Sequence, residues 1–321
     1  MRSRGIASSF KRFIMTLMFL SVAIALTACG DQEKGQTKGG QAEGKIKITT
    51  TIGMISDVVK QVGGQHVEVT GLMKSGVDPH LYKASQGDVK KLEQAQMIFY
   101  NGLHLEGKMV EIFEKMAKDK PTVAVSRNIP EAQLRGWEGG EASHDPHIWF
   151  NVKHWISAAE VIRDELGKLD SAHAEDYKNN AEAYIKQLKE LDQYAMTQIG
   201  SIPEAQRVLV TAHDAFGYFG DAYHIKVLGL QGISTASEYG SKDVSDLREF
   251  LVSNRIKAVF VESSVPKKSI EAVIEGAKKQ GHEVKIGGEL FSDAMGEDGT
   301  PEGTYIGMVR HNVDTIVKAL K

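Results

Sequence analysis

Residues 171–200, SAHAEDYKNNAEAYIKQLKELDQYAMTQIG, decide how the rest of the chain is arranged. Apolar residues recur every three or four positions from Tyr177 onward, which predicts one amphipathic α-helix over Ser171–Ile199 that ends at Gly200. At 1.5 Å per residue such a helix is about 43 Å long, the height of a whole molecule of this size. Its apolar stripe lacks the sustained charged flanks of a coiled coil. We therefore interpret it as a backbone helix that connects two parts of the chain.

Strand and helix patterns alternate on both sides of this helix. The predicted strands are Lys45–Ile52, Val67–Met73, Met97–Tyr100, Thr122–Val125, Arg207–Thr211, Ile225–Leu228, Ala258–Val261 and Glu283–Leu290. The predicted helices include Ser85–Ala95, 105–116, Val152–Leu169, Asp243–Asn254, Lys267–Gln280 and Thr304–Leu320. Repeated strand–helix units imply parallel sheets covered on both faces. We predict an α/β fold of two lobes, each a parallel sheet flanked by helices, at 45–168 and 201–321, joined by the long helix at 169–200.

The first 28 residues have the organisation of a signal peptide. Basic side chains precede a nearly uninterrupted apolar stretch, Phe13–Leu26. This stretch is shorter than the about 20 residues needed to span a bilayer, but it suits the apolar region of a signal peptide. It ends in Leu26-Thr27-Ala28-Cys29, which resembles a bacterial lipobox, and Cys29 is the only cysteine. We predict cleavage before Cys29 and lipidation of its thiol; the alternative is an uncleaved signal anchor with an ordinary cysteine.

The segment after Cys29 has the composition of a flexible tether. Gly30–Gly44 contains no apolar side chain larger than alanine, so residues 29–44 cannot contribute to a hydrophobic core. The folded part is therefore expected to face the outside of the cytoplasm, lipid-anchored at the cell membrane. A formal net charge of −3, with no Lys/Arg run beyond the N-terminus, argues against a nucleic-acid partner. We expect a monomer.

The tripeptide Asp-Pro-His occurs twice, at 78–80 and 145–147, and a third Asp-flanked histidine is His213. A proline fixes its own φ and favours an extended conformation in the preceding residue, so the following histidine lies on a stiffened loop. Neutral imidazole is a good ligand for zinc, manganese, iron and copper. With three such positions, we favour metal ligation by His80, His147 and His213. The alternative is that each is a surface histidine beside a helix start.

A carboxylate occupies a comparable position after the last predicted strand. That strand runs out through Gly-Gly-Glu-Leu-Phe-Ser to Asp293, and ligands of open parallel sheets collect beyond the carboxyl ends of the strands. Two ligands from each lobe would place one ion in the cleft between the lobes. The alternative role for Asp293 is to cap a helix. His144 could reach the cleft mouth, and the remaining histidines are interpreted as surface or packing residues.

Six segments carry a resemblance over essentially the whole mature chain: Gly76-Val-Asp-Pro-His80-Leu-Tyr, Asn101-Gly-Leu, Asp145-Pro-His147-Ile-Trp-Phe, Thr211-Ala-His213-Asp-Ala-Phe-Gly-Tyr-Phe, Val261-Glu-Ser and Leu290-Phe-Ser-Asp293. Together they resemble the substrate-binding lipoproteins of bacterial manganese and zinc ABC importers. The resemblance implies the metal-type periplasmic-binding-protein fold, whose long helix restricts hinge opening. Carried over position by position, it implies the metal ligands His80, His147, His213 and Asp293.

The same resemblance implies a function without chemical turnover. One divalent ion is captured in the cleft and delivered to an ABC permease, which works with its ATPase subunit. Glu262 and Trp149 are expected to orient or shield the ligands. Manganese, zinc and iron are the candidate ions. We expect Mn²⁺ because zinc-specific members commonly carry a His- and acid-rich loop before the second Asp-Pro-His, whereas Glu131–Ser143 is short and contains no histidine.

Two other classes of function are weighed against metal import. Three histidines with a water in the fourth position would resemble the catalytic zinc site of a metallo-hydrolase, but a fourth protein ligand closes that position. No His-Glu-x-x-His or Gly-x-Ser-x-Gly motif is present in the sequence. A surface adhesin is the other alternative, because lipoproteins of this family have been interpreted as adhesins. No dedicated adhesive repeat supports it.

Overall fold

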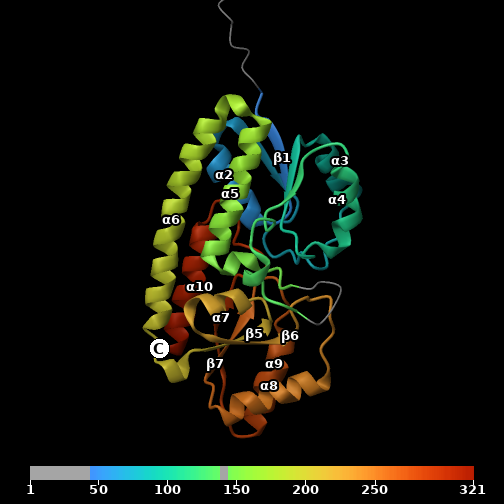
Figure 1. Ribbon diagram of the computed structural model, residues 1–321. Helices are drawn as coiled ribbons and strands as arrows, with labels where there is room; N and C mark the ends of the chain where they lie inside the picture. Colours follow the sequence, from blue (N-terminus) through green and yellow to red (C-terminus); the bar gives the residue numbers. More distant parts are fainter. Residues whose placement is uncertain (1–43, 138–143) are drawn as a thin grey trace, which may run out of the picture. The chain divides into compact units, whose positions relative to one another are not determined.

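The computed structural model describes residues 44–137 and 144–321, and Gly44–Lys321 forms one compact unit (Figure 1). The predicted signal peptide, the lipidation site Cys29 and the tether up to residue 43 lie outside the described residues. Among the helices of the described part, none combines the length and apolar composition that crossing a membrane requires.

The first lobe is built on a four-stranded parallel sheet. Its strand order is β2–β1–β3–β4, with bounds β1 Ile46–Thr50, β2 Val67–Gly71, β3 Met97–Tyr100 and β4 Thr122–Ala124. Its helices are α2 Gly53–Gly63, α3 Gln86–Gln94, α4 Val110–Met116 and α5 Val152–Leu169. Figure 1 shows α3 and α4 on one side of the sheet and α2 and α5 on the other. The sheet is therefore covered on both faces, as the alternation of strands and helices predicts.

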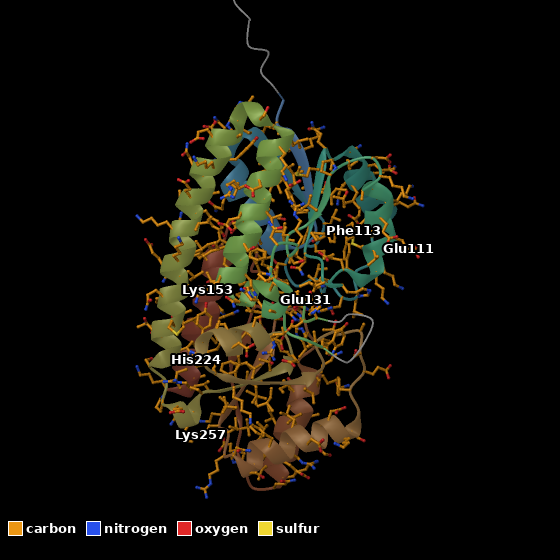
Figure 2. All side chains as sticks on the ribbon, in the orientation of Figure 1. Glu111, Phe113, Glu131, Lys153, His224 and Lys257 are labelled. Atoms are coloured by element: carbon orange, nitrogen blue, oxygen red, sulfur yellow. The ribbon has the colours of Figure 1, made fainter. Side chains whose placement is uncertain are left out.

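Local chemistry sets where these elements begin and which side chains they bury. Ser85 caps α3 by accepting a hydrogen bond from Asp88 N, and the Asp88 carboxylate accepts one from Ser85 N in return. On α4, Phe113 is buried on the side of the sheet, whereas Glu111 is exposed on the outer side (Figure 2). The Phe113 ring stacks on Tyr100 of β3 with 4.4 Å between centroids. One apolar face per helix thus holds the layers together.

The second lobe contains two adjoining pairs of parallel strands. β5 Val208–His213 pairs with β6 Lys226–Gln231, β7 Ala258–Glu262 pairs with β8 Lys285–Leu290, and β5 contacts β7. Its helices are α7 Gly217–Tyr223, α8 Ser241–Ser253, α9 Lys268–Lys279 and α10 Tyr305–Leu320. α8 and α9 cover one face of these strands, and α7 and α10 cover the other (Figure 1). Both lobes are parallel α/β layers, which confirms the predicted fold class.

One helix, α6 Ala174–Gly200, packs against both lobes (Figure 1). It has 27 residues and is therefore about 40 Å long. Near its start, Asn180 Nδ2 donates to Val62 O of α2 at 3.1 Å; nearer its end, Asp192 Oδ1 accepts from the Tyr223 hydroxyl of α7 at 3.1 Å. No proline or glycine interrupts the helix before its last residue, so bending it would break its backbone hydrogen bonds. The predicted apolar stripe is buried, comprising Tyr177, Ala181, Tyr184, Leu188, Leu191, Ala195 and Ile199.

The observed elements differ from the predicted ones mainly at their ends. Ser171–His173 forms a 3₁₀ turn before α6, and the helix predicted over 105–116 is divided into a 3₁₀ turn at Gly107–Met109 followed by α4. α7 was not predicted, because its seven residues include two glycines and are too few to show a repeating apolar pattern. The domain boundaries at 168 and 200 stay predictions, since the larger hydrophobic core contains residues of both lobes.

Candidate metal centre

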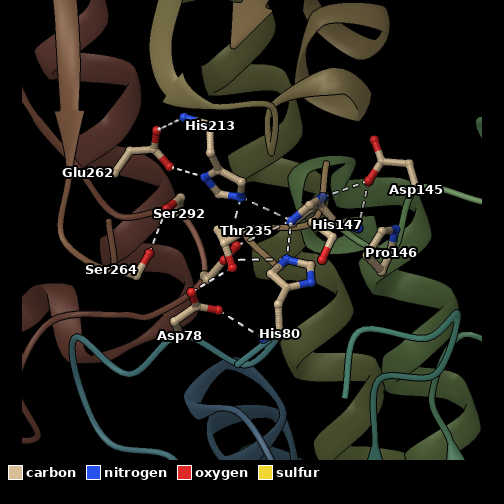
Figure 3. Close-up of polar contacts among 12 residues, drawn as sticks. Asp78, His80, Asp145, Pro146, His147, His213, Thr235, Glu262, Ser264 and Ser292 are labelled. Atoms are coloured by element: carbon tan, nitrogen blue, oxygen red, sulfur yellow. Dashed lines mark hydrogen bonds and ion pairs between the residues drawn. The ribbon is translucent and has the colours of Figure 1, made fainter. Parts of the chain in front are cut away.

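The four predicted ligands lie together where the two lobes meet, and Figure 3 shows the three histidines among them. His80 lies in the loop between β2 and α3, and His147 directly precedes the turn Ile148–Phe150 that leads into α5. His213 is the last residue of β5, and Asp293 follows β8. One nitrogen or oxygen atom from each residue lies within 4.8 Å of the others. None of the four residues is more than 5% exposed.

The distances among these atoms suit a single small cation. His147 Nε2 lies 3.3 Å from His80 Nε2 and 3.4 Å from His213 Nε2. Asp293 Oδ1 is 3.3 Å from His147 Nε2, and Oδ2 is 3.6 Å from His80 Nε2 and 3.5 Å from His213 Nε2. Four tetrahedral ligands about 2.0–2.1 Å from an ion are separated by about 3.3–3.4 Å. Because both Asp293 oxygens face the imidazoles, the carboxylate can supply one or two ligand atoms.

Two of the three imidazoles are oriented by a buried carboxylate. Asp145 Oδ1 accepts hydrogen bonds from His147 N at 2.9 Å and from His147 Nδ1 at 2.7 Å. Glu262 accepts from His213 N at 2.8 Å and from His213 Nδ1 at 2.5 Å (Figure 3). A proton on Nδ1 leaves a lone pair on Nε2, which is the tautomer that a metal ligand requires. The carboxylates therefore aim both Nε2 atoms at the same point.

His80 is held in a different way. Its backbone N–H donates to Asp78 Oδ1 at 2.9 Å, just as His147 N donates to Asp145. The second oxygen, Asp78 Oδ2, accepts a hydrogen bond from Thr235 Oγ1 of the second lobe at 2.6 Å. The carboxylate behind His80 is thus shared between the lobes.

The Asp293 carboxylate is buried without a hydrogen-bond donor. It is 1% exposed, and neither of its oxygens accepts a hydrogen bond from a described residue. Burial by itself would raise the pKa of Asp293, but the neighbouring His213, His147 and His80 outweigh burial and hold it below its ordinary value. The side chain therefore stays ionised and faces the imidazoles. It does not cap a helix, so the alternative role considered for it is not seen.

Burial and the flanking carboxylates set the protonation of the imidazoles. Burial disfavours the charged form of His147. The carboxylates of Asp145 and Asp293 outweigh burial and raise the pKa of His147 to about 10. The pKa of His213 is also raised, because the carboxylates of Glu262 and Asp293 outweigh burial. For His80 burial dominates and lowers the pKa to about 3. At neutral pH, a cation entering the site must therefore displace a proton from His147.

The structure also locates the residues predicted beside the ligands. Trp149 is fully buried and packs edge-on against His147, with 5.3 Å between ring centroids. Its Nε1 donates to Ser292 O at 3.0 Å, which connects the second Asp-Pro-His loop to the segment that carries the carboxylate ligand. His144 does not join the cluster, and its Nε2 pairs with Glu131 Oε1 at 2.9 Å.

Sequence reasoning assigned no role to several residues that shape the site. Asp145 orients His147, and a signal for this was present, because a carboxylate two residues before a histidine can reach its backbone N–H. Asn101 Nδ2 donates to Pro146 O at 2.9 Å, and the Tyr218 hydroxyl donates to Asp145 O at 2.9 Å. These two residues lie far away in the chain, and only the folded structure brings them to the loop.

Residues 48–319 match the family model ZnuA, described as zinc-uptake complex component A, periplasmic. The chain is 51% identical over 302 residues to the manganese-binding lipoprotein MntA of Bacillus subtilis (strain 168), covering 94% of this chain and 97% of that protein. It is 50% identical over 284 residues to the zinc-binding protein TroA of Treponema pallidum (strain Nichols), covering 88% and 92%. A third relative, 31% identical over 313 residues, is the manganese ABC transporter substrate-binding lipoprotein PsaA of Streptococcus anginosus, covering 95% and 97%.

The fold agrees with this relationship. The solved structure of periplasmic zinc-binding protein TroA superimposes with a TM-score of 0.84 at 50% sequence identity, covering 86% of this chain and 99% of that one. The names of these relatives include both manganese and zinc, and each is the name of a binding or transport protein rather than of an enzyme. The chain belongs to the ZnuA family of metal-binding substrate-binding proteins.

Proposed function

We propose that this protein captures one divalent metal ion, Mn²⁺ in preference to others, outside the cytoplasm and delivers it to an ABC permease. His80, His147, His213 and Asp293 would hold the ion as transported substrate. The observation that carries the proposal is the buried Asp293 carboxylate, which accepts no hydrogen bond from a described residue and faces three imidazole Nε2 atoms. A divalent cation would complete this arrangement, because it would replace the imidazole protons and bond directly to the carboxylate and to the Nε2 atoms.

Manganese is the first candidate and zinc the second. The segment before the second Asp-Pro-His contains no histidine over 131–143, and a relative with 51% identity is named as manganese-binding. A carboxylate with both oxygens facing the site also suits the harder ion. Zinc is supported by the three imidazoles, since intrinsic affinities of such ligands rise from Mn²⁺ toward Zn²⁺. It is also supported by a relative with 50% identity that is named as zinc-binding. Fe²⁺ is the remaining alternative.

Uptake of radioactive metal by cells tests this function. A strain lacking the protein should take up ⁵⁴Mn²⁺ more slowly than its parent from a metal-poor medium, whereas uptake of ⁶⁵Zn²⁺ should be unchanged. The wild-type chain should restore manganese uptake, and the His213→Ala variant should not. A selective loss of zinc uptake would instead identify Zn²⁺ as the transported ion. Normal uptake of manganese, zinc and iron would contradict a transport role.

The proposed partners are the permease and its ATPase subunit, and the proposed location is the outer face of the cytoplasmic membrane. PsaA, which is 31% identical, is named as the substrate-binding lipoprotein of a manganese ABC transporter. We propose that the chain acts there as a monomer, anchored through a lipid on Cys29. Metal would pass from the cleft to the permease without a chemical reaction.

Replacing Cys29 with serine should release the protein from the membrane fraction or leave it with an uncleaved leader. The reason is that a hydroxyl cannot accept the thioether-linked lipid, and the sequence carries no second cysteine. Membrane fractionation and mass spectrometry of the N-terminus provide the measurement. Gln36→Ala, a substitution within the tether, serves as the control and should partition like wild type. Unchanged membrane association of Cys29→Ser with a normally processed N-terminus would rule out the lipid anchor.

A further inference from the structure

The three histidines of the site differ in how they are secured. His147 and His213 each have both the backbone N–H and the ring Nδ1 bonded to a single carboxylate. Asp78 bonds only the backbone N–H of His80, because its other oxygen accepts from Thr235 Oγ1 at 2.6 Å (Figure 3). Asp78 therefore takes the place of an orienting carboxylate but divides its two oxygens between the lobes.

The chain around His80 is a loop that is held by side-chain contacts, since Ser75 Oγ donates to Met295 O at 2.9 Å and the Tyr82 hydroxyl donates to Asp88 Oδ2 at 2.8 Å. No helix or strand occurs between the end of β2 at Gly71 and the start of α3 at Gln86. The next residue, Leu81, is 51% exposed. By contrast, His213 belongs to a strand and is paired in register with Gln231 of β6. His80 thus depends on contacts made by its loop more than His213 does.

The carboxylate ligand is attached to a better secured segment. Asn312 of α10 bonds both sides of Phe291, accepting from Phe291 N at 2.9 Å and donating to Phe291 O at 2.7 Å. The next carbonyl, Ser292 O, accepts from Trp149 Nε1 at 3.0 Å. The backbone that carries Asp293 is therefore fixed from two directions, and His80 remains the least supported of the four residues.

Thr235 is itself tied to the strand beside His213. Gln231 ends β6, and its Nε2 donates to Thr235 O at 2.6 Å and to Ser237 O at 2.9 Å. These bonds hold the segment after β6 so that the Thr235 hydroxyl reaches Asp78. A continuous series of contacts thus connects the β5–β6 pair of the second lobe to the His80 loop of the first.

We infer that Asp78 and Thr235 form a latch between the lobes, which keeps His80 on the metal and makes His80 the first ligand to leave when the lobes separate. The inference rests on the proposed metal-binding function. Asp78 is a positioning residue, since it holds the backbone of His80 and does not touch the ion. The Asp78–Thr235 contact lines a groove of about 570 Å³, so a small separation of the lobes can break it without rearranging either sheet.

The dissociation rate of Mn²⁺ from the Thr235→Val variant tests the latch. Valine keeps the shape of threonine and removes the hydroxyl, so the variant should lose Mn²⁺ about tenfold faster than wild type, as expected for one hydrogen bond to a charged group. Stopped-flow mixing with an excess chelator provides the rate. Thr235→Ser keeps the hydroxyl and should restore the wild-type rate. Thr197→Val is the matched control and should keep the wild-type rate, because Thr197 is exposed on α6 and its Oγ1 donates to Gln193 O at 2.8 Å within the same helix.

Combined variants show whether the latch acts through His80. Thr235→Val should weaken Mn²⁺ binding in the His213→Ala background but have no further effect in the His80→Ala background. An equal effect in both backgrounds, or wild-type dissociation in Thr235→Val, would overturn the latch while leaving the proposed function intact. If wild-type protein binds neither Mn²⁺ nor Zn²⁺, the proposed function fails and the latch fails with it.

Discussion

Replacing Asp293 with alanine should lower the affinity for Mn²⁺ by at least about a hundredfold. Loss of a residue that only orients a ligand typically costs about 10–100-fold, and Asp293 would contribute the only anionic ligand. Three imidazoles would remain, two of which hold protons more tightly than usual. Isothermal titration of metal-free protein measures the affinity directly.

The Asp293→Ala substitution should also reduce the amount by which Mn²⁺ stabilises the folded protein against heat. A ligand that binds only the folded state stabilises it in proportion to the logarithm of its concentration over Kd, so a hundredfold weaker site loses about 2.7 kcal/mol of that stabilisation. The melting temperature should therefore rise with Mn²⁺ in wild type and much less in Asp293→Ala. Asp298→Ala, an exposed carboxylate nearby in the chain, is the control and should behave as wild type. Unaltered stoichiometry and affinity in Asp293→Ala would remove it from the site.

Metal affinity should rise steeply with pH between pH 6 and pH 8. Without metal, the carboxylates hold the pKa of His147 at about 10, so its imidazole carries a proton on both ring nitrogens in this range, and they also raise the pKa of His213. Because the ion takes Nε2, the proton on His147 Nε2 must leave when the ion binds. Each proton displaced makes the affinity about tenfold higher per pH unit, until the pH passes the raised pKa values. Titrations at pH 6, 7 and 8 measure this slope.

Calorimetry in two buffers with different ionisation enthalpies counts the protons released, and we expect between one and two per ion. Asp145→Asn is the informative variant, because asparagine can still accept from His147 Nδ1 but carries no charge. It should lower the pKa of His147 and make the pH dependence of binding shallower. An affinity that stays constant from pH 6 to pH 8 would contradict the assigned protonation states.

Sequence patterns predicted the regular elements well where apolar periodicity was strong. The strand Met97–Tyr100 and the helix Val152–Leu169 have the predicted bounds. The helix α7 was missed, because Gly217–Tyr223 is held by contacts with distant parts of the chain rather than by a pattern of its own. Local periodicity therefore recovers long elements and misses short ones that tertiary packing stabilises.

The residues of the candidate site also fall into those that local sequence predicts and those that only the folded structure reveals. The two Asp-Pro-His tripeptides predict His80 and His147 as candidate ligands from local sequence. Asp293 was predicted only with the family resemblance, because an aspartate after a strand more often caps a helix. Thr235 was not predictable, because its role depends on a hydrogen bond to Asp78 that forms across the two lobes. Residues that act through such long-range contacts leave no local pattern, so the latch could be found only in the folded structure.

Two features of the fold together imply a small opening movement. The uninterrupted helix α6 contacts helices of both lobes, so a wide hinge motion would require breaking its backbone hydrogen bonds. The Asp78–Thr235 contact, by contrast, is a single hydrogen bond between side chains. We therefore expect metal release to follow a slight separation of the lobes that frees His80.

Anomalous X-ray scattering at the manganese edge, from crystals grown with Mn²⁺, would locate the bound ion. We expect one strong peak, within about 2.5 Å of the Nε2 atoms of His80, His147 and His213 and of an Asp293 carboxylate oxygen. A manganese peak elsewhere on the molecule, with none among these four residues, would contradict it.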